Sequence, residues 1–391
     1  QTNRQVDHSI PQISTRFWDM VLQEHAKYNE EGLFDESLAT FFRHTDDKCV
    51  SRNIPLGNGK NRIRELRARA VLIDMEERVI NGIRASPQKE LFDDRQIVLS
   101  NSGSGNNWAM GYKHYGEMYR ERISDTVRSE VEMVDTLQSL FTISSTGGGT
   151  GSGLGSFVVE LLQDEYPGAS KFSTVVMPSA DDDVVTSPYN SVLALSKLTD
   201  SADCILPVEN QALIDICKKV DEGKTERQKG TALTDSPVDG MLKKAKPFDT
   251  MNNIVANLMI NLTSSTRFPG SLNMDINELA VNLVPFPRIR YLLSSMTPLY
   301  VLADRKAIPR KIGQMFLDCF SRETQLMKAD PRNSTYLGCA LLVRGDAEMS
   351  DIRRNIDRLK PTLKFIPWNP DGWKVGLCSA APLNQVSAPC T

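Results

Sequence analysis

The 391-residue sequence lacks the features of a secreted, membrane-spanning or nucleic-acid-binding protein. Its seven cysteines are odd in number and scattered, with no Cys-x-x-Cys pair, which argues against a disulfide framework or a zinc site and favours free thiols in a reducing cytosol. No apolar run is long enough to cross a bilayer, and the first residues show no signal-peptide pattern. Lys and Arg number 46 against 49 Asp and Glu, so we expect neither nucleic acid nor membrane as a partner.

The remaining composition is that of an ordinary globular protein, with 40% hydrophobic and 24% charged residues, and the length suggests two or three domains. Short apolar runs alternate with amphipathic stretches, which predicts an α/β fold. In the first half of the chain the pattern predicts strands at 70–73, 139–145, 172–177 and 203–208.

The domain organisation follows from a break in this pattern. Residues 1–248 are predicted to form a nucleotide-binding domain, in which the charged, aperiodic segment 218–247 is a mobile surface loop. A long central helix is expected over 249–266, with Asp249 as its N-cap and an apolar face made by Met251, Ile254, Val255, Leu258, Met259 and Leu262. Residues 267–391 alternate strands and helices again and predict a second α/β domain.

A glycine-rich loop at 146–153, with the sequence TGGGTGSG, lies between a predicted strand and a predicted helix. Its glycines let the backbone approach a ligand closely, and its N–H groups, with the N-terminus of the following helix, suit a phosphate. The alternative is a tight turn without a ligand. A Walker A loop is excluded because no Lys-Ser or Lys-Thr follows, and the GxGxxG spacing fails because position 154 is Leu.

Two carboxylates and an amide are candidates to join this loop. Asp74 and Glu76 alternate at the end of a predicted strand and can face the same side, where a phosphate site would need Mg²⁺ to offset their charge. The alternative is a pair of solvated carboxylates at a strand end. Asn106 is a candidate donor to phosphate oxygens or, alternatively, an asparagine that caps its loop.

These motifs resemble those of the tubulin family. The loop GGGTGSG after a strand and before a helix is similar to the family's signature, and further similar stretches lie in the family's order at 69–76, 106–109, 188–191, 282–288, 330–332 and 372–376. The resemblance covers about residues 13 to 378. Within the family it is strongest to the epsilon branch, because Ser187 precedes Pro-Tyr-Asn and the polar loop 218–247 is inserted; the delta branch is the nearest rival.

The resemblance implies a Rossmann-like nucleotide-binding domain with a mostly parallel sheet, a central helix and a second α/β domain, with GTP or GDP and Mg²⁺ as ligands. It implies phosphate contacts from Asn106, Ser145, Gly147, Gly148, Gly149, Thr150 and Gly151. It further implies Mg²⁺ at Asp74 and Glu76, directly or through water, and ribose or base contacts from Gln12, Asp183, Asn210, Phe248 and Asn252. Phe248 reads alternatively as a hydrophobic staple at the start of the helix.

Two stretches depart from the family pattern. Residues 7–13 stand where tubulins carry a Gly-Gln-Cys-Gly phosphate loop, and only Gln12 and Ile13 match. The sequence also ends shortly after 372–376, so we expect the family's C-terminal helical layer to be absent. Either the chain is a fragment or a mis-assembled product, or it has lost both ends. We expect both departures to weaken nucleotide affinity and stability.

Glu278 lies in a loop that, in tubulins, contacts the nucleotide of the next subunit. The resemblance therefore implies a GTPase whose catalytic acid, Glu278, acts in trans on the neighbouring subunit's GTP. The alternative is structural, because Asp275-x-x-Glu278 also reads as a capping box for a helix over 276–283.

The resemblance thus implies an epsilon-like, GTP-binding tubulin-superfamily subunit of the cytoplasmic cytoskeleton. Its expected place is the centrosome, centriole or basal body, where it would take part in microtubule organisation. Its expected partners are other tubulin subunits, in head-to-tail contact, and centriole or basal-body components. One alternative is a tubulin homologue that has lost nucleotide binding and acts only as a structural or interaction protein. Another is a dinucleotide-dependent oxidoreductase, which should show GxGxxG.

Overall fold

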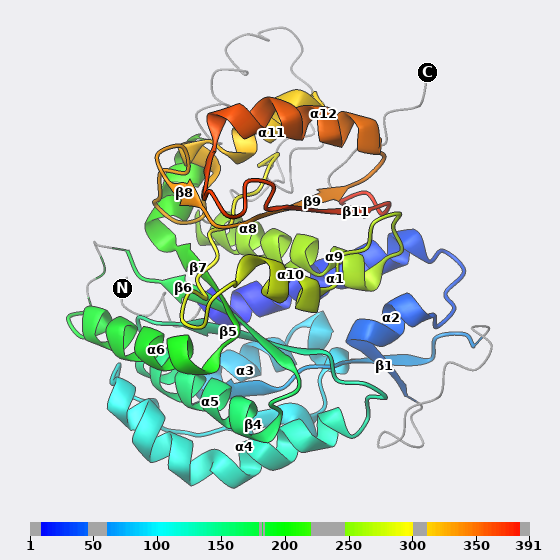
Figure 1. The fold of residues 1–391 in the computed structure, drawn as a ribbon. Helices are drawn as coiled ribbons and strands as arrows, with labels where there is room; N and C mark the ends of the chain where they lie inside the picture. Colours follow the sequence, from blue (N-terminus) through cyan, green and yellow to red (C-terminus); the bar gives the residue numbers. More distant parts are fainter. Residues whose placement is uncertain are drawn as a thin grey trace, which may run out of the picture.

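The structure of the chain, a computed structural model, describes residues 9–45, 61–179, 182, 184–219, 247–299 and 311–383. Nearly all of the predicted loop 218–247 lies outside the described residues, as does Asp183. Figure 1 shows two parts, with the first half of the chain in the lower part and the last third in the upper part.

Helices and strands alternate in the lower part, as the sequence predicts. In chain order the elements are α1 (Ser9–Tyr28), α2 (Glu36–Phe41), β1 (Phe42–Thr45), β2 (Glu65–Ala68), β3 (Leu72–Asp74), α3 (Glu77–Arg84), short 3₁₀ turns η1 (Pro87–Leu91) and η2 (Asp94–Gln96), β4 (Ile97–Leu99), a π-helical segment η3 (Met110–Tyr115), α4 (Gly116–Val131), β5 (Ser139–Ser145), a second π-helical segment η4 (Thr150–Leu154), α5 (Gly155–Glu165), β6 (Ser170–Met177), α6 (Ser187–Ser201), β7 (Cys204–Glu209) and a helix over 210–219.

The strands of this part are mostly parallel, but they form separate pieces. Strands β5, β6 and β7 make one parallel sheet in that order, and β3 pairs in parallel with β4. Strands β1 and β2 form an antiparallel pair. The prediction of a parallel α/β sheet is confirmed, although the strand predicted at 70–73 lies at Leu72–Asp74.

Helices cover both faces of these strands. Apolar residues of η4 and α5 at helical spacing, Leu154, Val158, Leu161 and Leu162, share a core with Val98 of β4 and with residues of α4. Figure 1 shows α4, α5 and α6 below the β5–β6–β7 sheet and α1 beside α8 above it. The carboxyl ends of β3, β5 and β6 lie at one edge of this layered structure.

The central helix runs as α8 (Pro247–Leu262) and continues, after Thr263, as the short α9 (Ser264–Arg267). Thr263 Oγ1 donates to Met259 O at 2.9 Å, a side-chain bond that competes with regular helix geometry where the two helices meet. Met251, Ile254, Val255, Leu258 and Met259 are buried, as predicted, whereas Leu262 is only partly buried. The prediction of Asp249 as N-cap is wrong, because α8 begins at Pro247 and Asp249 lies inside the first turn.

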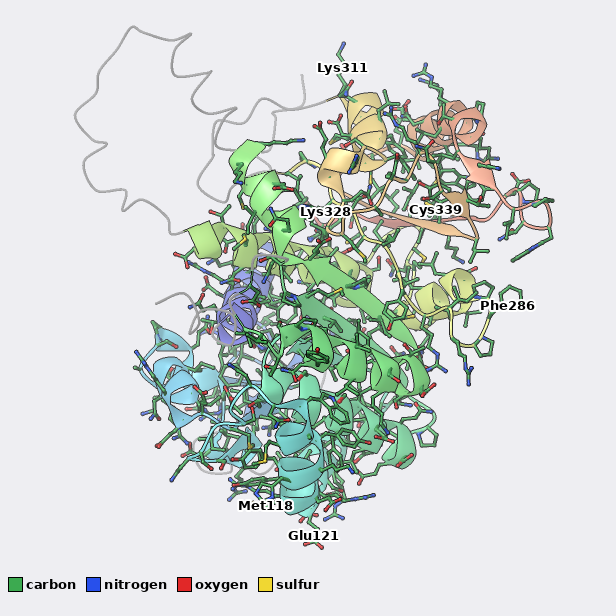
Figure 2. All side chains as sticks on the ribbon, turned by 90° about the vertical axis from the view of Figure 1, so that its left-hand side faces the viewer. Met118, Glu121, Phe286, Lys311, Lys328 and Cys339 are labelled. Carbon is green, nitrogen blue, oxygen red and sulfur yellow. The ribbon has the colours of Figure 1, made fainter. Side chains whose placement is uncertain are left out.

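The upper part contains α10 (Ile276–Leu283), α11 (Ile312–Cys319), η6 (Arg322–Thr324), β8 (Thr335–Tyr336), β9 (Cys339–Arg344), α12 (Met349–Leu359), η7 (Lys360–Thr362), β10 (Lys364–Phe365) and β11 (Trp373–Cys378). Strands β9 and β11 pair in parallel, and α11 and α12 pack on them through a core of their own. Figure 2 shows the two parts at opposite ends, with Met118 and Glu121 of α4 at one end and Cys339 of β9 towards the other.

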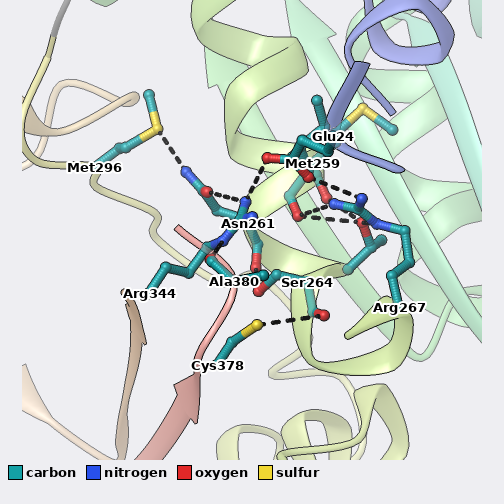
Figure 3. Close-up of polar contacts among 11 residues, drawn as sticks. Glu24, Met259, Asn261, Ser264, Arg267, Met296, Arg344, Cys378 and Ala380 are labelled. Atoms are coloured by element: carbon teal, nitrogen blue, oxygen red, sulfur yellow. Dashed lines mark hydrogen bonds and ion pairs between the residues drawn. The ribbon is translucent and has the colours of Figure 1, made fainter. Parts of the chain in front are cut away.

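A buried charge cluster joins the two parts (Figure 3). Glu24 of α1 pairs with Arg267 Nη1 of α9 at 2.8 Å and with Arg344 Nη1 of β9 at 2.9 Å, and all three side chains are less than 5% exposed. Arg344 also donates to Asn261 Oδ1 of α8 at 3.0 Å. Because a buried charge is tolerated only when it is paired, this cluster fixes how the first helix, the central helix and the upper sheet meet.

Candidate functional site

The carboxyl ends of three strands bring together the segments that the sequence singled out. Asp74 ends β3, the loop 103–106 follows β4, and the glycine loop follows β5. Ser104 and Thr150 join the second and third segments through a hydroxyl–hydroxyl bond of 2.9 Å. Ligands of parallel α/β folds bind at this edge of the sheet, so this is where a nucleotide site is expected.

Glycines in the loop are required first by the protein's own backbone. A Cβ at Gly149 would lie 2.5 Å from the backbone nitrogen of Asn107, and one at Gly151 would lie 2.7 Å from the carbonyl oxygen of Ser145. A Cβ at Gly153 would clash with the carbonyl of Trp108. The loop therefore packs closely against neighbouring backbone of the protein itself. The sequence alone does not distinguish this requirement for glycine from close approach to a ligand.

Asn106 has a left-handed backbone, with φ 55°, directly after Gly105 at φ 58°. Asparagine tolerates this conformation better than most residues, so Asn106 suits this position in the loop. Its carbonyl accepts hydrogen bonds from Asn190 Nδ2 at 2.8 Å and Thr186 Oγ1 at 2.9 Å. The residue also lines the cavity described below, together with Ser145, Thr150 and Gly151.

Asn190 is a residue of the site for which sequence reasoning gave no role. It lies in α6, is 3% exposed, and donates both to Asn106 O and to Gly147 O, the latter at 3.0 Å. Its Oδ1 accepts from the backbone N–H of Trp108 at 3.0 Å. One amide therefore holds the glycine loop and the loop after β4 in register, and the only signal in the sequence was its position in the Pro-Tyr-Asn-Ser stretch.

Asp74 and Glu76 lie where the sequence predicted, at the end of β3. The backbone N–H of Glu76 donates to Asp74 Oδ1 at 3.2 Å, and the Glu76 carboxylate lies beside Gly103. Both residues line the same cavity as Thr150 and Gly151 of the glycine loop. Carboxylate oxygens suit Mg²⁺. Among the described residues, no group of three or more ligating side chains occurs.

Of the predicted base-side residues, Gln12 and Asn252 are brought together: Asn252 Nδ2 donates to Gln12 Oε1 at 2.9 Å. Asn252 is 4% exposed on α8, whereas Gln12 is exposed on α1. Asn210 is partly buried directly after β7. Phe248 lies in the first turn of α8, but its side chain, like all of Asp183, is outside the described part of the chain.

A cavity of about 1490 Å³ opens at this site and runs beneath it. It is lined by residues of β3, β5 and α1 and by the site residues Asp74, Glu76, Asn106, Ser145, Thr150 and Gly151. The volume is larger than that of a usual small-molecule pocket, which spans roughly 300–1,000 Å³.

Glu278 lies apart from this cavity, on α10. Asp275 caps that helix by accepting from the N–H of Ile276 at 2.6 Å, as predicted. The Glu278 carboxylate does not complete a capping box; it pairs with Lys374 Nζ of β11 at 3.3 Å and remains about half exposed. Glu278 is not among the residues that line the cavity around this chain's own glycine loop.

Comparison with known proteins accounts for this arrangement. Residues 11–218 match the GTPase domain of the Tubulin/FtsZ family, and residues 287–389 match the Tubulin C-terminal domain. The chain belongs to the tubulin family. It is 51% identical over 387 residues to the Tubulin epsilon chains of Mus musculus and Homo sapiens, which covers 97% of this chain and 81% of each relative.

Other branches of the family are more distant. The Tubulin alpha-1 chain of Saccharomyces cerevisiae is 33% identical over 95% of this chain and 78% of its own length. The chain is thus a homologue of epsilon tubulin in a family of GTP- and GDP-binding cytoskeletal proteins whose partners are tubulin subunits. Within the described residues, no helix is both long and apolar enough to span a membrane.

Proposed function

We propose that the chain is a GTP-binding, epsilon-type tubulin subunit that assembles head to tail with other tubulin subunits. The observation that carries the proposal is that Asp74, Glu76, Asn106, Ser145, Thr150 and Gly151 line one cavity. Backbone N–H groups and the start of a helix favour phosphate there, and Asn252 offers an amide edge to guanine.

Each part of the site has a distinct task in this proposal. The loop 147–151 and Ser145 hold the phosphates, while Gln12, Asp183, Asn210, Phe248 and Asn252 contact the ribose and the base. A magnesium ion, held through its water shell by Asp74 and Glu76, would neutralise phosphate charge. Hydrolysis would use Glu278 of a neighbouring subunit, because each chain's own Glu278 lies outside its own cavity.

One observation favours a second function, that of a tubulin homologue without nucleotide. Gly147, Gly148 and Gly149 are buried and are not among the residues that line the cavity. A chain of this kind would act only as a structural or interaction protein. The two proposals differ in one measurable property, which is the affinity for GTP.

Equilibrium binding of fluorescent GTP in the presence of Mg²⁺ tests the proposal. Gly148→Val places a branched side chain in the phosphate loop and should weaken binding by at least about tenfold, equivalent to about 1.4 kcal/mol. Gly168→Val is the matched control, because a Cβ at Gly168 meets nothing within 4 Å. If the parent chain binds GTP no better than Gly148→Val, the nucleotide-free function stands.

The cellular part of the proposal is a role in the centriole or basal body and in microtubule organisation. It is supported by the 51% identity to epsilon chains. A fluorescently tagged chain, expressed in ciliated cells, should concentrate at centrioles or basal bodies. An even cytoplasmic distribution of the tagged, folded chain would contradict this role.

A further inference from the structure

The buried amide of Asn190, on α6, bonds to three backbone groups of the candidate site. Its Nδ2 donates to Gly147 O at 3.0 Å and to Asn106 O at 2.8 Å, and its Oδ1 accepts from the N–H of Trp108 at 3.0 Å. Both hydrogens of the amide nitrogen are therefore used. A flipped amide would set its oxygen against two carbonyl oxygens, so the side chain has one orientation.

Two serine side chains hold the carbonyl groups on either side of Gly147. Ser191 Oγ, also on α6, donates to Thr146 O at 3.3 Å, and Ser152 Oγ, on η4, donates to Gly148 O. Both serines are buried. Three successive carbonyl groups of the glycine loop are therefore each bonded to a buried side chain.

The direction of these carbonyl groups determines the direction of the N–H groups that follow them. In a planar trans peptide, the C=O of one residue and the N–H of the next point in opposite directions. The bonds to Thr146 O and Gly147 O therefore turn the N–H groups of Gly147 and Gly148 away from α6. Within the part of the chain that the structure describes, neither N–H group donates to a backbone acceptor. Both glycines are buried, and buried N–H groups of native proteins are almost always paired.

An anion is the acceptor that suits these two N–H groups. They are adjacent in the chain, and their glycines leave no side chain in the way of a ligand. Ser145, before them, and Thr150, after them, both line the cavity of the candidate site. The donors are thus oriented before a ligand arrives, and such preorganisation lowers the cost of binding.

We propose that Asn190, assisted by Ser191, is a positioning residue of the nucleotide site. It holds the carbonyl groups of the glycine loop so that the N–H groups of Gly147 and Gly148 face the phosphates. Asn190 would act through the backbone, without touching the ligand. The inference rests on the proposed function, because it assigns phosphate as the acceptor of these N–H groups. A merely structural role would be to fasten α6 to its neighbours, with no preference for ligands that carry phosphate.

Affinities of the full chain for GTP, GDP and guanosine, measured by calorimetry with Mg²⁺ present, separate the two roles. Asn190→Ala removes the amide without adding charge. It should weaken GTP and GDP binding by about 10–100-fold, the effect of one to two lost phosphate bonds. Guanosine carries no phosphate, so its affinity should change by less than about twofold, which is within about 0.4 kcal/mol.

The matched control is Asn355→Ala, on α12 in the upper part. Asn355 is also a buried asparagine, 8% exposed, and its amide also donates to a carbonyl group, Asp351 O, at 2.8 Å. This variant loses the same kind of bond far from the glycine loop and should keep all three affinities at the parent values.

Amide hydrogen exchange of the chain without nucleotide tests the orientation of the loops directly. Asn190→Ala should speed exchange by at least about tenfold over 104–108 and 146–149, because the bonds that hold these segments are lost. Exchange there should stay at the parent rate in Asn355→Ala. If Asn190→Ala does not fold, Ser191→Ala, which removes one hydroxyl, takes its place. It should weaken GTP binding by about two- to tenfold and leave guanosine binding unchanged.

Several results would overturn the inference while GTP binding by the parent, and with it the proposed function, stands. Equal losses for GTP and guanosine in Asn190→Ala would show a structural role only. Unchanged GTP affinity, or a loss of affinity without faster exchange in the two loops, would also count against positioning. If the parent chain itself binds no GTP, the proposed function fails, and this inference fails with it.

Discussion

Asn252 and Gln12, 240 positions apart in the sequence, meet in a side-chain hydrogen bond of 2.9 Å from Asn252 Nδ2 to Gln12 Oε1. The bond joins the start of α1 to the first turns of α8. Because Asn252 is buried and its amide carries both donors and an acceptor, it can still offer one edge to a base while Gln12 fixes its orientation.

The first prediction concerns base selectivity. Asn252→Asp replaces the amide donors with acceptors and should reduce GTP affinity by roughly 10–100-fold, which corresponds to about 1.4–2.7 kcal/mol of lost polar interaction. Asn257→Asp, on the same helix, is the control: the Asn257 amide donates to Asn253 O within the helix, and no loss of GTP affinity is expected. Equal losses in the two variants would show that the effect comes from added charge on α8.

The second prediction is a loss of stability in acid. Burial, with a smaller effect from the positive charge of Arg267, lowers the pKa of His25 from 6.5 to about 3. Between these values the unfolded chain binds a proton that the folded chain excludes, so stability is complete above pH 6.5 and falls as the pH drops. The expected loss from this group is about 1.4 kcal/mol at pH 5.5.

Urea unfolding at pH 7.5 and pH 5.5 measures this loss. His25→Gln removes the titrating group, so the difference in unfolding free energy between the two pH values should shrink by about 1.4 kcal/mol relative to the parent. His114→Gln, at an exposed site, should leave the difference unchanged. A parent-like difference in His25→Gln would assign the acid sensitivity to other groups.

These elements show what the sequence could and could not predict. Strands β5, β6 and β7 are predictable because β-branched and aromatic residues fill them, and each lies within two residues of its predicted bounds. The division of the parallel strands into the pair β3–β4 and the triplet β5–β6–β7 is not predictable from local pattern, because a strand's neighbours are set by residues far away in the sequence. The role of Asn190 is not predictable for the same reason, because its three side-chain hydrogen bonds reach residues 43 to 84 positions away in the sequence.

The third prediction concerns the charge cluster of Figure 3. Glu24→Gln removes the negative charge that offsets Arg267 and Arg344 and leaves two buried guanidinium groups without a counter-charge. Loss of one partner in a buried ion pair typically costs about 3–5 kcal/mol, so the variant should unfold at much lower urea concentration. Asp125→Asn removes one partner of an exposed pair with Arg128 and should cost at most about 1 kcal/mol. Similar costs for the two variants would contradict the prediction.

The last prediction concerns Glu278 and its ion pair with Lys374 at 3.3 Å. If Glu278 orients water on the next subunit's GTP, Glu278→Ala should slow hydrolysis in assembled chains by about 10²–10⁴-fold while GTP binding stays intact. If Glu278 has only a structural role, the Glu278→Ala variant should lose some stability and hydrolyse GTP at the parent rate. Lys374→Met separates the two roles, because it breaks the ion pair but keeps the carboxylate, and it should retain hydrolysis.

Mixing two defective chains decides whether the action is in trans. Gly148→Val chains keep Glu278 but are not expected to hold nucleotide, and Glu278→Ala chains hold nucleotide but lack the acid. In a mixture, some loaded Glu278→Ala subunits are followed by a partner with an intact Glu278, so GTP hydrolysis should rise above that of either variant alone. The rise should depend on total protein concentration, because it needs contact between subunits. Sedimentation should first show that the mixture assembles. If GTP hydrolysis in that mixture stays at the level of the separate variants, Glu278 takes no part in the reaction. Its role is then structural, through the ion pair with Lys374.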